Sequence, residues 1–345
     1  MQSKHMPFLK LGAMASLLLA SATVLLVCRS LPDERGIHTE VAQASSQPLA
    51  SVPHIGPCPI FPADNVWNIP IDTLPKDPRA DRYTDSIGPL KPLHPDFGTD
   101  MASGIPFTEA PPGTLPGTVT FDNREESDLG RYPIPPNAPI EGNRYSTDSD
   151  HHILVIDSER CLLYELWLAR PQQDGWLAGS GIRMDLTSNA LRTDGFTSAD
   201  AAGLPILPGL VRYDEVASGQ ITHALRFTLP HTQKSHIWPA RHDASHLMDA
   251  NLPPLGIRFR LRADFDLSKY SKTNQVILTA LKRYGMFLAD NGSPMFLTGV
   301  PDRRWDDHDL HKLTAIASED FEPVDESTLQ ILPDSARVDP VALKH

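Results

Sequence analysis

The sequence predicts a mainly β fold: a two-sheet sandwich or jelly roll with one or two packed helices and long ordered loops. Proline supports this first, because the 345 residues include 33 prolines, which are excluded from helix interiors and from central strands. The apolar runs are also short, and some alternate with polar residues as half-buried strands do. Hydrophobic residues make up 40% of the chain, an ordinary fraction for a globular protein with a sizeable core.

Residues 1–28 are predicted to be an export signal or a retained signal anchor. Lysines and a histidine precede an apolar run over 11–27, whose length lies at the short edge of what spans a bilayer. Both alternatives stay open. In either case the rest of the chain is expected in the periplasm or the extracellular medium. Residues 29–56 are polar and dotted with proline, as is typical of a flexible tether.

The folded body is expected over 57–325 as a single β-rich domain, followed by a C-terminal tail over 326–345. Cys58 and Cys161 are the only cysteines beyond the export segment. In an oxidising compartment a disulfide between them is the expected state, and two buried thiols are the alternative.

Within the body, the first 90 residues are rich in proline and glycine and predict an extended layer. A β-hairpin is predicted next, from HHILVID at 151–157 and CLLYELWLA at 161–169. The segment IRFRLRADF at 257–265 alternates strictly, so its three arginines share a face that is wet or meets an acidic partner.

A helix is predicted over 273–284, because its apolar residues form one stripe, Ser271 or Thr273 can cap it, and a glycine follows it. The next segment, MFLADNGSPMFLTG, predicts a hairpin that turns at Asp290-Asn291-Gly292. A last helix is predicted over 307–317.

Charge and motif content exclude several classes of function. The formal net charge is −12 and no run of Lys and Arg offsets it, so binding to nucleic acid or anionic lipid is not expected, apart from the N-terminal anchor. Zinc signatures such as HExxH and paired CxxC are absent, and so is the GxSxG serine motif. No cofactor or metal is expected. A divalent cation on Asp148, Asp150 and Asp185 is the alternative left open.

Residues 178–216 form a long segment of turns that carries acids, amides and arginines between apolar anchors. Either these charges pair with one another in a packed structural loop, or they line a sugar-binding cleft in which aromatic faces cover the apolar faces of sugars. The cleft hypothesis predicts ligand contacts from five residues: Asn189, Arg192, Tyr213, Trp176 and Trp238.

The histidine-rich stretch 221–242 is predicted to supply one wall of that cleft. His223 shares a strand face with apolar residues and is expected to be a hydrogen-bonded core residue. The strand end that carries Trp238, Arg241 and His242 combines a flat ring, a permanent cation and a titratable ring.

Two catalytic schemes fit these residues. A glycosidase needs two carboxylates, for which Asp185 and Asp200 are the candidates. A uronate lyase needs a neutralising cation, Arg241 or Arg192, and a base such as His242 or Tyr213.

Four segments resemble those of a family of predicted secreted bacterial proteins with no established activity. They are SNALRTDGFTSADAAGLPILPGLVRYDEV, HALRFT, IWPARH and ALKRYGMFLADNG, and the likeness covers about residues 57–325. The resemblance implies a shared extracellular fold and transfers no catalytic residue.

The sequence therefore predicts an exported protein that acts on a polysaccharide or a cell-envelope glycan, as a glycan hydrolase or a uronate lyase. The alternative from another class is a non-catalytic carbohydrate-binding or envelope adhesion module.

Overall fold

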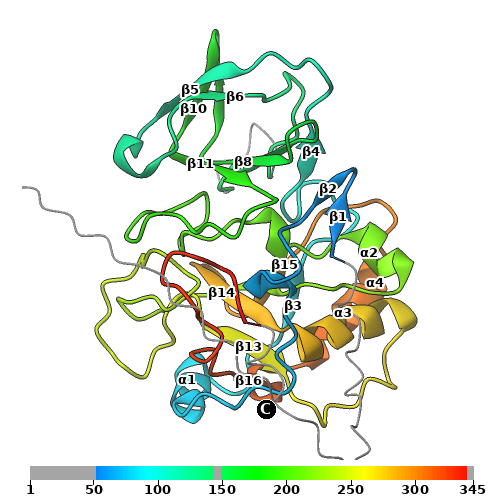
Figure 1. The fold of residues 1–345 in the computed structure, drawn as a ribbon. Helices are drawn as coiled ribbons and strands as arrows, with labels where there is room; N and C mark the ends of the chain where they lie inside the picture. The colour runs from blue at the N-terminus through cyan, green and yellow to red at the C-terminus, as the bar shows by residue number, and fades with distance from the viewer. Residues whose placement is uncertain (1–51, 143–148, 340–345) are drawn as a thin grey trace, which may run out of the picture. The chain divides into compact units, whose positions relative to one another are not determined.

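The computed structural model describes residues 52–142 and 149–339 (Figure 1). The predicted export segment and most of the predicted tether lie outside the described residues. In the part of the chain that is described, no helix is long and apolar enough to cross a membrane.

The prediction of a mainly β protein with few helices is confirmed. The largest sheet among the described residues has six strands in the order β16-β13-β14-β12-β15-β3. Their bounds are His94–Asp96 (β3), Leu225–Leu229 (β12), Arg258–Leu261 (β13), Met286–Asn291 (β14), Phe296–Thr298 (β15) and Phe321–Pro323 (β16). Most residues of β12 and β14 are buried and apolar, and Arg226 and Asp290 are the charged residues within these two strands.

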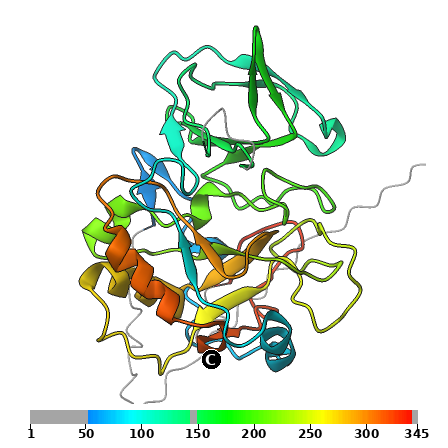
Figure 2. The same ribbon diagram turned by 180° about the vertical axis from the view of Figure 1, so that it is seen from behind.

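Two four-stranded sheets and a short ribbon complete the β structure (Figures 1 and 2). One sheet contains Phe107–Glu109 (β4), Ile153–Asp157 (β7), Leu162–Trp167 (β8) and Ser180–Asp185 (β11). The other contains Gly117–Phe121 (β5), Arg131–Tyr132 (β6), Arg170–Gln172 (β9) and Gly175–Ala178 (β10). The ribbon pairs His54–Ile55 (β1) with Cys58–Pro59 (β2).

The apolar residues form two clusters. The larger one includes the six-stranded sheet and the helix α3, Lys272–Arg283. The smaller one contains side chains from both four-stranded sheets, among them Val119, Tyr132, Val155 and Trp176. The structure thus has more sheets than the two expected, and it includes parallel strand pairs such as β12 with β14.

The helices agree with the capping signals in the sequence. Ser271 caps α3 by accepting a hydrogen bond from the backbone N–H of Asn274, and Gly285 follows the helix with φ 65°. The other α-helices are shorter: Ala80–Ile87 (α1), Tyr213–Ser218 (α2) and Asp307–His311 (α4). The helix expected over 307–317 therefore ends early and continues as a 3-10 turn over Lys312–Ala315.

The arginines of β13 form ion pairs with acidic residues. Arg258 is fully buried and donates to Glu326 Oε1 at 2.8 Å, and Arg260 pairs with Glu322 at 2.7 Å. The acidic partner lies in the same chain. Part of it comes from the predicted tail, in which Leu329 and Val338 are also buried.

The hairpin predicted around Asp290-Asn291-Gly292 does not form. Strands β14 and β15 are not neighbours: each pairs with β12, which lies between them. Gly292 has no positive φ, and the left-handed residue of this connection is Met295, with φ 57°. Asp290 consequently lies within β14 and not in a turn.

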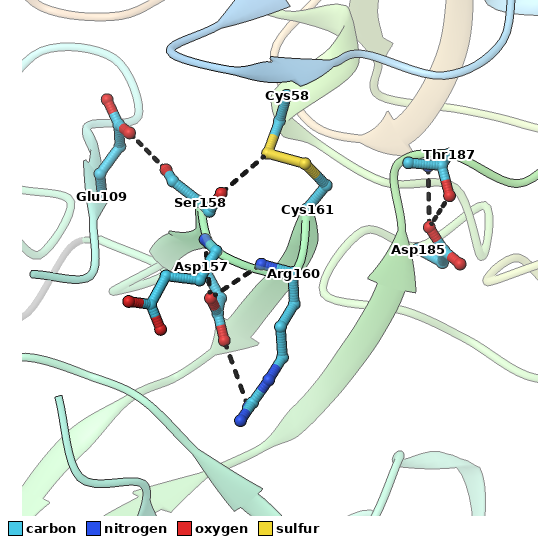
Figure 3. The surroundings of a disulfide bond; sticks show 9 residues. Cys58, Glu109, Asp157, Ser158, Arg160, Cys161, Asp185 and Thr187 are labelled. Carbon is cyan, nitrogen blue, oxygen red and sulfur yellow. Dashed lines mark hydrogen bonds and ion pairs between the residues drawn. A yellow bond between two sulfur atoms is a disulfide. The ribbon is translucent and has the colours of Figure 1, made fainter. Parts of the chain in front are cut away.

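The predicted disulfide between Cys58 and Cys161 is confirmed (Figure 3). It joins β2 to the turn between β7 and β8, which form the antiparallel hairpin expected from the sequence. Its sequence separation of 103 residues constrains the unfolded chain by on the order of 4 kcal/mol. A disulfide is compatible with the predicted export, because such bonds persist in oxidising compartments.

Candidate functional site

A pocket of about 420 Å³ opens beside the end of β14. This volume lies within the range of small-molecule sites. Its walls combine two aromatic rings with an unusual number of acidic groups and come from segments far apart in the sequence: Asn123, Glu126, Asp150, Trp167, Ser180, Thr197–Ala201, His242, Ala244, Asp290 and Asn291.

Two of the wall residues, Asp200 and Asp290, form a carboxyl pair in which their side chains are hydrogen-bonded to each other. Arg226, from β12, holds the buried Asp200 with two parallel bonds, Nε to Oδ2 at 2.9 Å and Nη2 to Oδ1 at 2.8 Å. The remaining guanidinium nitrogen donates to Thr298 Oγ1 at 2.6 Å. This bidentate contact stabilises negative charge on Asp200, so the proton between the two acids belongs to Asp290.

Asp290 is the member of the pair that the pocket can reach. Its side chain is partly accessible, whereas that of Asp200 is 1% exposed. Surrounding protein atoms still desolvate Asp290, and this desolvation, together with the charge of Asp200, raises its pKa well above the ordinary value. Burial and the neighbouring carboxyl group thus favour the protonated form of Asp290 at the wall of a polar pocket.

The loop that carries Asp200 is held by His152, the residue before β7. Its Nδ1 lies 2.7 Å from Glu141 Oε2 and its Nε2 lies 2.9 Å from the carbonyl oxygen of Ala199. Two acceptors require two N–H donors, which only the imidazolium form has. Burial alone would lower the pKa of His152, but the Glu141 carboxylate raises it to about 9.

A second anchor, Glu165 of β8, holds the same loop a few residues further on. This fully buried carboxyl accepts hydrogen bonds from the backbone N–H groups of Ile206 and Leu207 at 2.9–3.0 Å. Burial raises the pKa of Glu165 to about 7, although these two bonds act in the opposite direction. Asp200 is thus positioned by one cation and two loop anchors.

Three further wall residues supply distinct chemical groups. His242 donates from Nδ1 to the carbonyl oxygen of Ala201 at 2.8 Å, which leaves Nε2 as its second ring nitrogen. Trp167 donates from Nε1 to Asp150 Oδ1 at 3.2 Å. Glu126, in contrast, accepts bonds from Thr197 and Asn123 and so holds the loop.

Among the predicted catalytic residues, the structure brings Asp200 and His242 to this pocket but not Asp185. Asp185 ends β11 and accepts bonds from both the backbone and the hydroxyl of Thr187 (Figure 3). With Arg192 it lines a separate pocket of about 370 Å³. Asp185 and Asp200 therefore line different pockets, and the acid that lies next to Asp200 is Asp290.

The predicted cations are engaged elsewhere. Arg241 donates to the carbonyl oxygens of Arg192 and Pro333 at 2.8 Å and to Asp334 at 2.6 Å. Arg192 in turn donates to Asp128 and to the carbonyl oxygens of Glu126 and Thr197. Neither guanidinium lines the 420 Å³ pocket.

The predicted ligand-binding residues also lie outside this pocket. Trp238 donates to the carbonyl oxygen of Ser335 at 2.9 Å. Asn189 bridges Asp64 and Asn65, and Trp176 is buried in the smaller core. Tyr213 packs on Trp305 with ring centroids 4.8 Å apart. His223, expected in the core, is fully buried and hydrogen-bonded to Ala224 and Glu215.

Sequence reasoning missed Asp290, Glu165 and Trp167. A signal for the two acids was present, because each lies inside an apolar run, MFLADN and LLYELW. A charged residue on a strand that is otherwise buried needs a partner or an altered pKa.

Within residues 52–142 and 149–339, no group of three or more His, Cys, Asp or Glu side chains is arranged to hold a metal ion. Of the three acids considered for a divalent cation, Asp148 lies outside these ranges. The other two line different pockets.

No protein-family model, curated protein or solved structure matches the chain. The resemblance to a family of secreted bacterial proteins stays a prediction, and function must be argued from the pocket itself.

Proposed function

We propose that the protein is an exported glycan hydrolase that cleaves neutral polysaccharides in the 420 Å³ pocket, with Asp290 as the general acid. The observation that carries the proposal is the carboxyl pair: Arg226 holds both oxygens of Asp200, and the neighbouring Asp290, whose pKa is raised by burial, lines the pocket. Glycoside hydrolysis needs one carboxyl group that stays protonated at neutral pH.

The second carboxyl group that we assign is Asp150, on the same pocket wall. Asp290 donates its proton to the glycosidic oxygen as the bond from that oxygen to the anomeric carbon breaks. Asp150 accepts a proton from a water molecule whose oxygen bonds to the anomeric carbon. Both carboxyl groups then return to their starting states by proton exchange with solvent.

The charge of the pocket favours a hydrolase over the uronate lyase considered from the sequence. Its walls include four acidic residues, and no Lys or Arg is among the described lining residues. A lyase needs a cation to neutralise the uronate carboxylate, and Arg241 and Arg192 point their donors at loop carbonyls instead. An acidic sugar would be repelled at this wall.

A reducing-end assay over a panel of neutral and acidic glycans, with absorbance at 235 nm recorded for unsaturated uronates, tests the proposal. Asp290→Asn should lower the rate roughly 10²–10⁴-fold, because the amide cannot donate an acidic proton. The exposed Asp266→Asn is the matched control and should hydrolyse at the wild-type rate.

Three results would contradict the proposal. Release of unsaturated uronate would identify a lyase, and loss of activity in Asp185→Asn with full activity in Asp290→Asn would move the catalytic site to the other pocket. Binding of glycans without turnover by the wild-type protein would favour the adhesion module.

A further inference from the structure

Trp167 is the one large aromatic surface among the described residues that line the pocket with the carboxyl pair. It is the last residue of β8 and is half-buried, with part of its ring packed against the larger core. A tryptophan that is neither buried nor free in solvent offers a flat apolar face to whatever fills the pocket.

The ring of Trp167 is held in place from two sides. Its Nε1 donates to Asp150 Oδ1 at 3.2 Å, and the backbone N–H of the following Leu168 donates to the carbonyl oxygen of Asp150 at 2.8 Å. Asp150 therefore fixes both the indole nitrogen of Trp167 and the main chain next to it. This indole also orients the carboxylate to which we assign the water-activating role.

Gly179 supports the other side of the ring. A Cβ at this position would lie 2.4 Å from Trp167 Cε3 and 2.8 Å from Cζ3, so only glycine admits the indole here. The backbone N–H of Gly179 donates to the carbonyl oxygen of Trp167 at 2.8 Å. The ring thus rests on bare backbone in a defined orientation, as a preorganised binding surface requires.

We propose that Trp167 is the stacking platform for a neutral hexopyranose unit, and so the residue that sets the substrate class; this rests on the proposed glycan hydrolysis. The C–H face of a pyranose covers an indole ring, while carboxylates such as Asp150 and Glu126 accept hydrogen bonds from sugar hydroxyls. A uronate or a sulfated sugar would bring its own anion against these acids and is excluded by them.

Isothermal titration on an Asp290→Asn background, which removes turnover, tests the platform. The probes are cello-, manno- and laminari-hexaose, chitohexaose and the acidic oligogalacturonate hexamer. Trp167→Ala should bind the preferred neutral hexamer at least roughly tenfold more weakly, and Trp167→Phe should recover much of the loss because a flat ring remains. Tyr270→Ala is the control, since Tyr270 is a half-buried aromatic residue that lines another pocket.

Folding of each variant is checked by its melting temperature, and Trp167→Phe keeps the test valid if Trp167→Ala unfolds. Equal affinity of both Trp167 variants and the parent, preference for oligogalacturonate, or binding of no probe would overturn the platform. The two proposals fail separately: a wild type that binds neutral hexamers through Trp167 without cleaving them refutes hydrolysis alone, and one that cleaves them at the same KM after Trp167→Phe and Trp167→Ala refutes the platform alone.

Discussion

Two buried arginines, Arg226 and Arg241, hold loops in this protein, and their surroundings differ in one respect. Arg241 donates to two carbonyl oxygens and to Asp334, whose side chain is 79% exposed. Arg226 donates to Asp200, whose side chain is 1% exposed and which contacts a second acid, Asp290. In the first arrangement, the donors of Arg241 all have acceptors, and its acidic partner Asp334 lies at the surface. The second has two carboxyl groups beside one guanidinium, and Asp290, the carboxyl group that Arg226 does not hold, lines a pocket.

A buried arginine therefore indicates a functional site only when the groups that it contacts are themselves chemically reactive. A guanidinium surrounded by backbone carbonyls is a structural clamp. A guanidinium that orders one of two adjoining carboxyl groups leaves the other without a cation, and burial then raises the pKa of that second group.

The largest expected effect comes from removing each arginine in turn. Arg226→Met should lower the free energy of unfolding by about 3–5 kcal/mol at pH 7, because it leaves Asp200 buried without its cation. Arg241→Met should cost about 1–2 kcal/mol, since its exposed acid partner can be solvated. Urea unfolding measures both, and the deficit of Arg226→Met should shrink at acid pH, because a buried carboxyl group that is protonated no longer needs a cation. Equal losses at both pH values would remove the distinction between the two sites.

The next effect is the pH dependence that Glu165 contributes. Its pKa is raised from 4.5 to about 7 in the folded state, so its contribution is complete below pH 4.5 and is lost as the pH rises through 7. This amounts to about 3 kcal/mol for the wild type. Glu165→Gln should lose this dependence between pH 4.5 and 7. The loss linked to His152, whose pKa is about 9, falls between pH 6.5 and 9 and should be the same in both proteins. Parallel stability curves from pH 4.5 to 7 would contradict the assignment.

Trp238→Ala tests whether the histidine-rich strip is a ligand wall. Trp238 packs against the larger core and donates to the carbonyl oxygen of Ser335, so the variant should lose about 2–3 kcal/mol of stability. Its affinity for glycans should not change, because the residue does not line the pocket of the carboxyl pair. Melting curves and titrations measure the two effects. Lost glycan affinity at unchanged stability would restore the strip as the binding site predicted from the sequence.

The smallest expected effect is that of Asp334→Asn. An exposed ion pair contributes about 0–1 kcal/mol, and Arg241 keeps its two carbonyl acceptors in the variant. Asp200→Asn, the matched change at the other arginine, should cost several times more and also lower the rate of glycan cleavage. Urea unfolding of the two variants side by side checks this order, and a larger loss for Asp334→Asn would reverse it.

Local chemistry explains the predictions that succeeded. The cap at Ser271, the stripe of α3 and the hairpin of β7 and β8 depend on neighbours within a few residues, and these are visible in the sequence. The turn at Asp290-Asn291-Gly292 failed because a local signal was overridden: β12 inserts between β14 and β15, so the two strands cannot pair with each other. Asp185 and Asp200, both within the segment 178–216, line different pockets, so nearness along the chain did not bring these two acids together.

The sequence by itself determined the mainly β class, through its prolines and short apolar runs, and the disulfide, through the count of cysteines left after the predicted export segment. It also placed Asp200 and His242 among the candidate residues. Only the tertiary structure decided that Asp200 contacts Asp290, 90 positions away, and that Arg226 donates two hydrogen bonds to Asp200. The physical reason is that the protonation of a carboxyl group depends on burial and on charges within a few ångströms, and those neighbours are set by strand order and loop packing, which local sequence patterns do not encode.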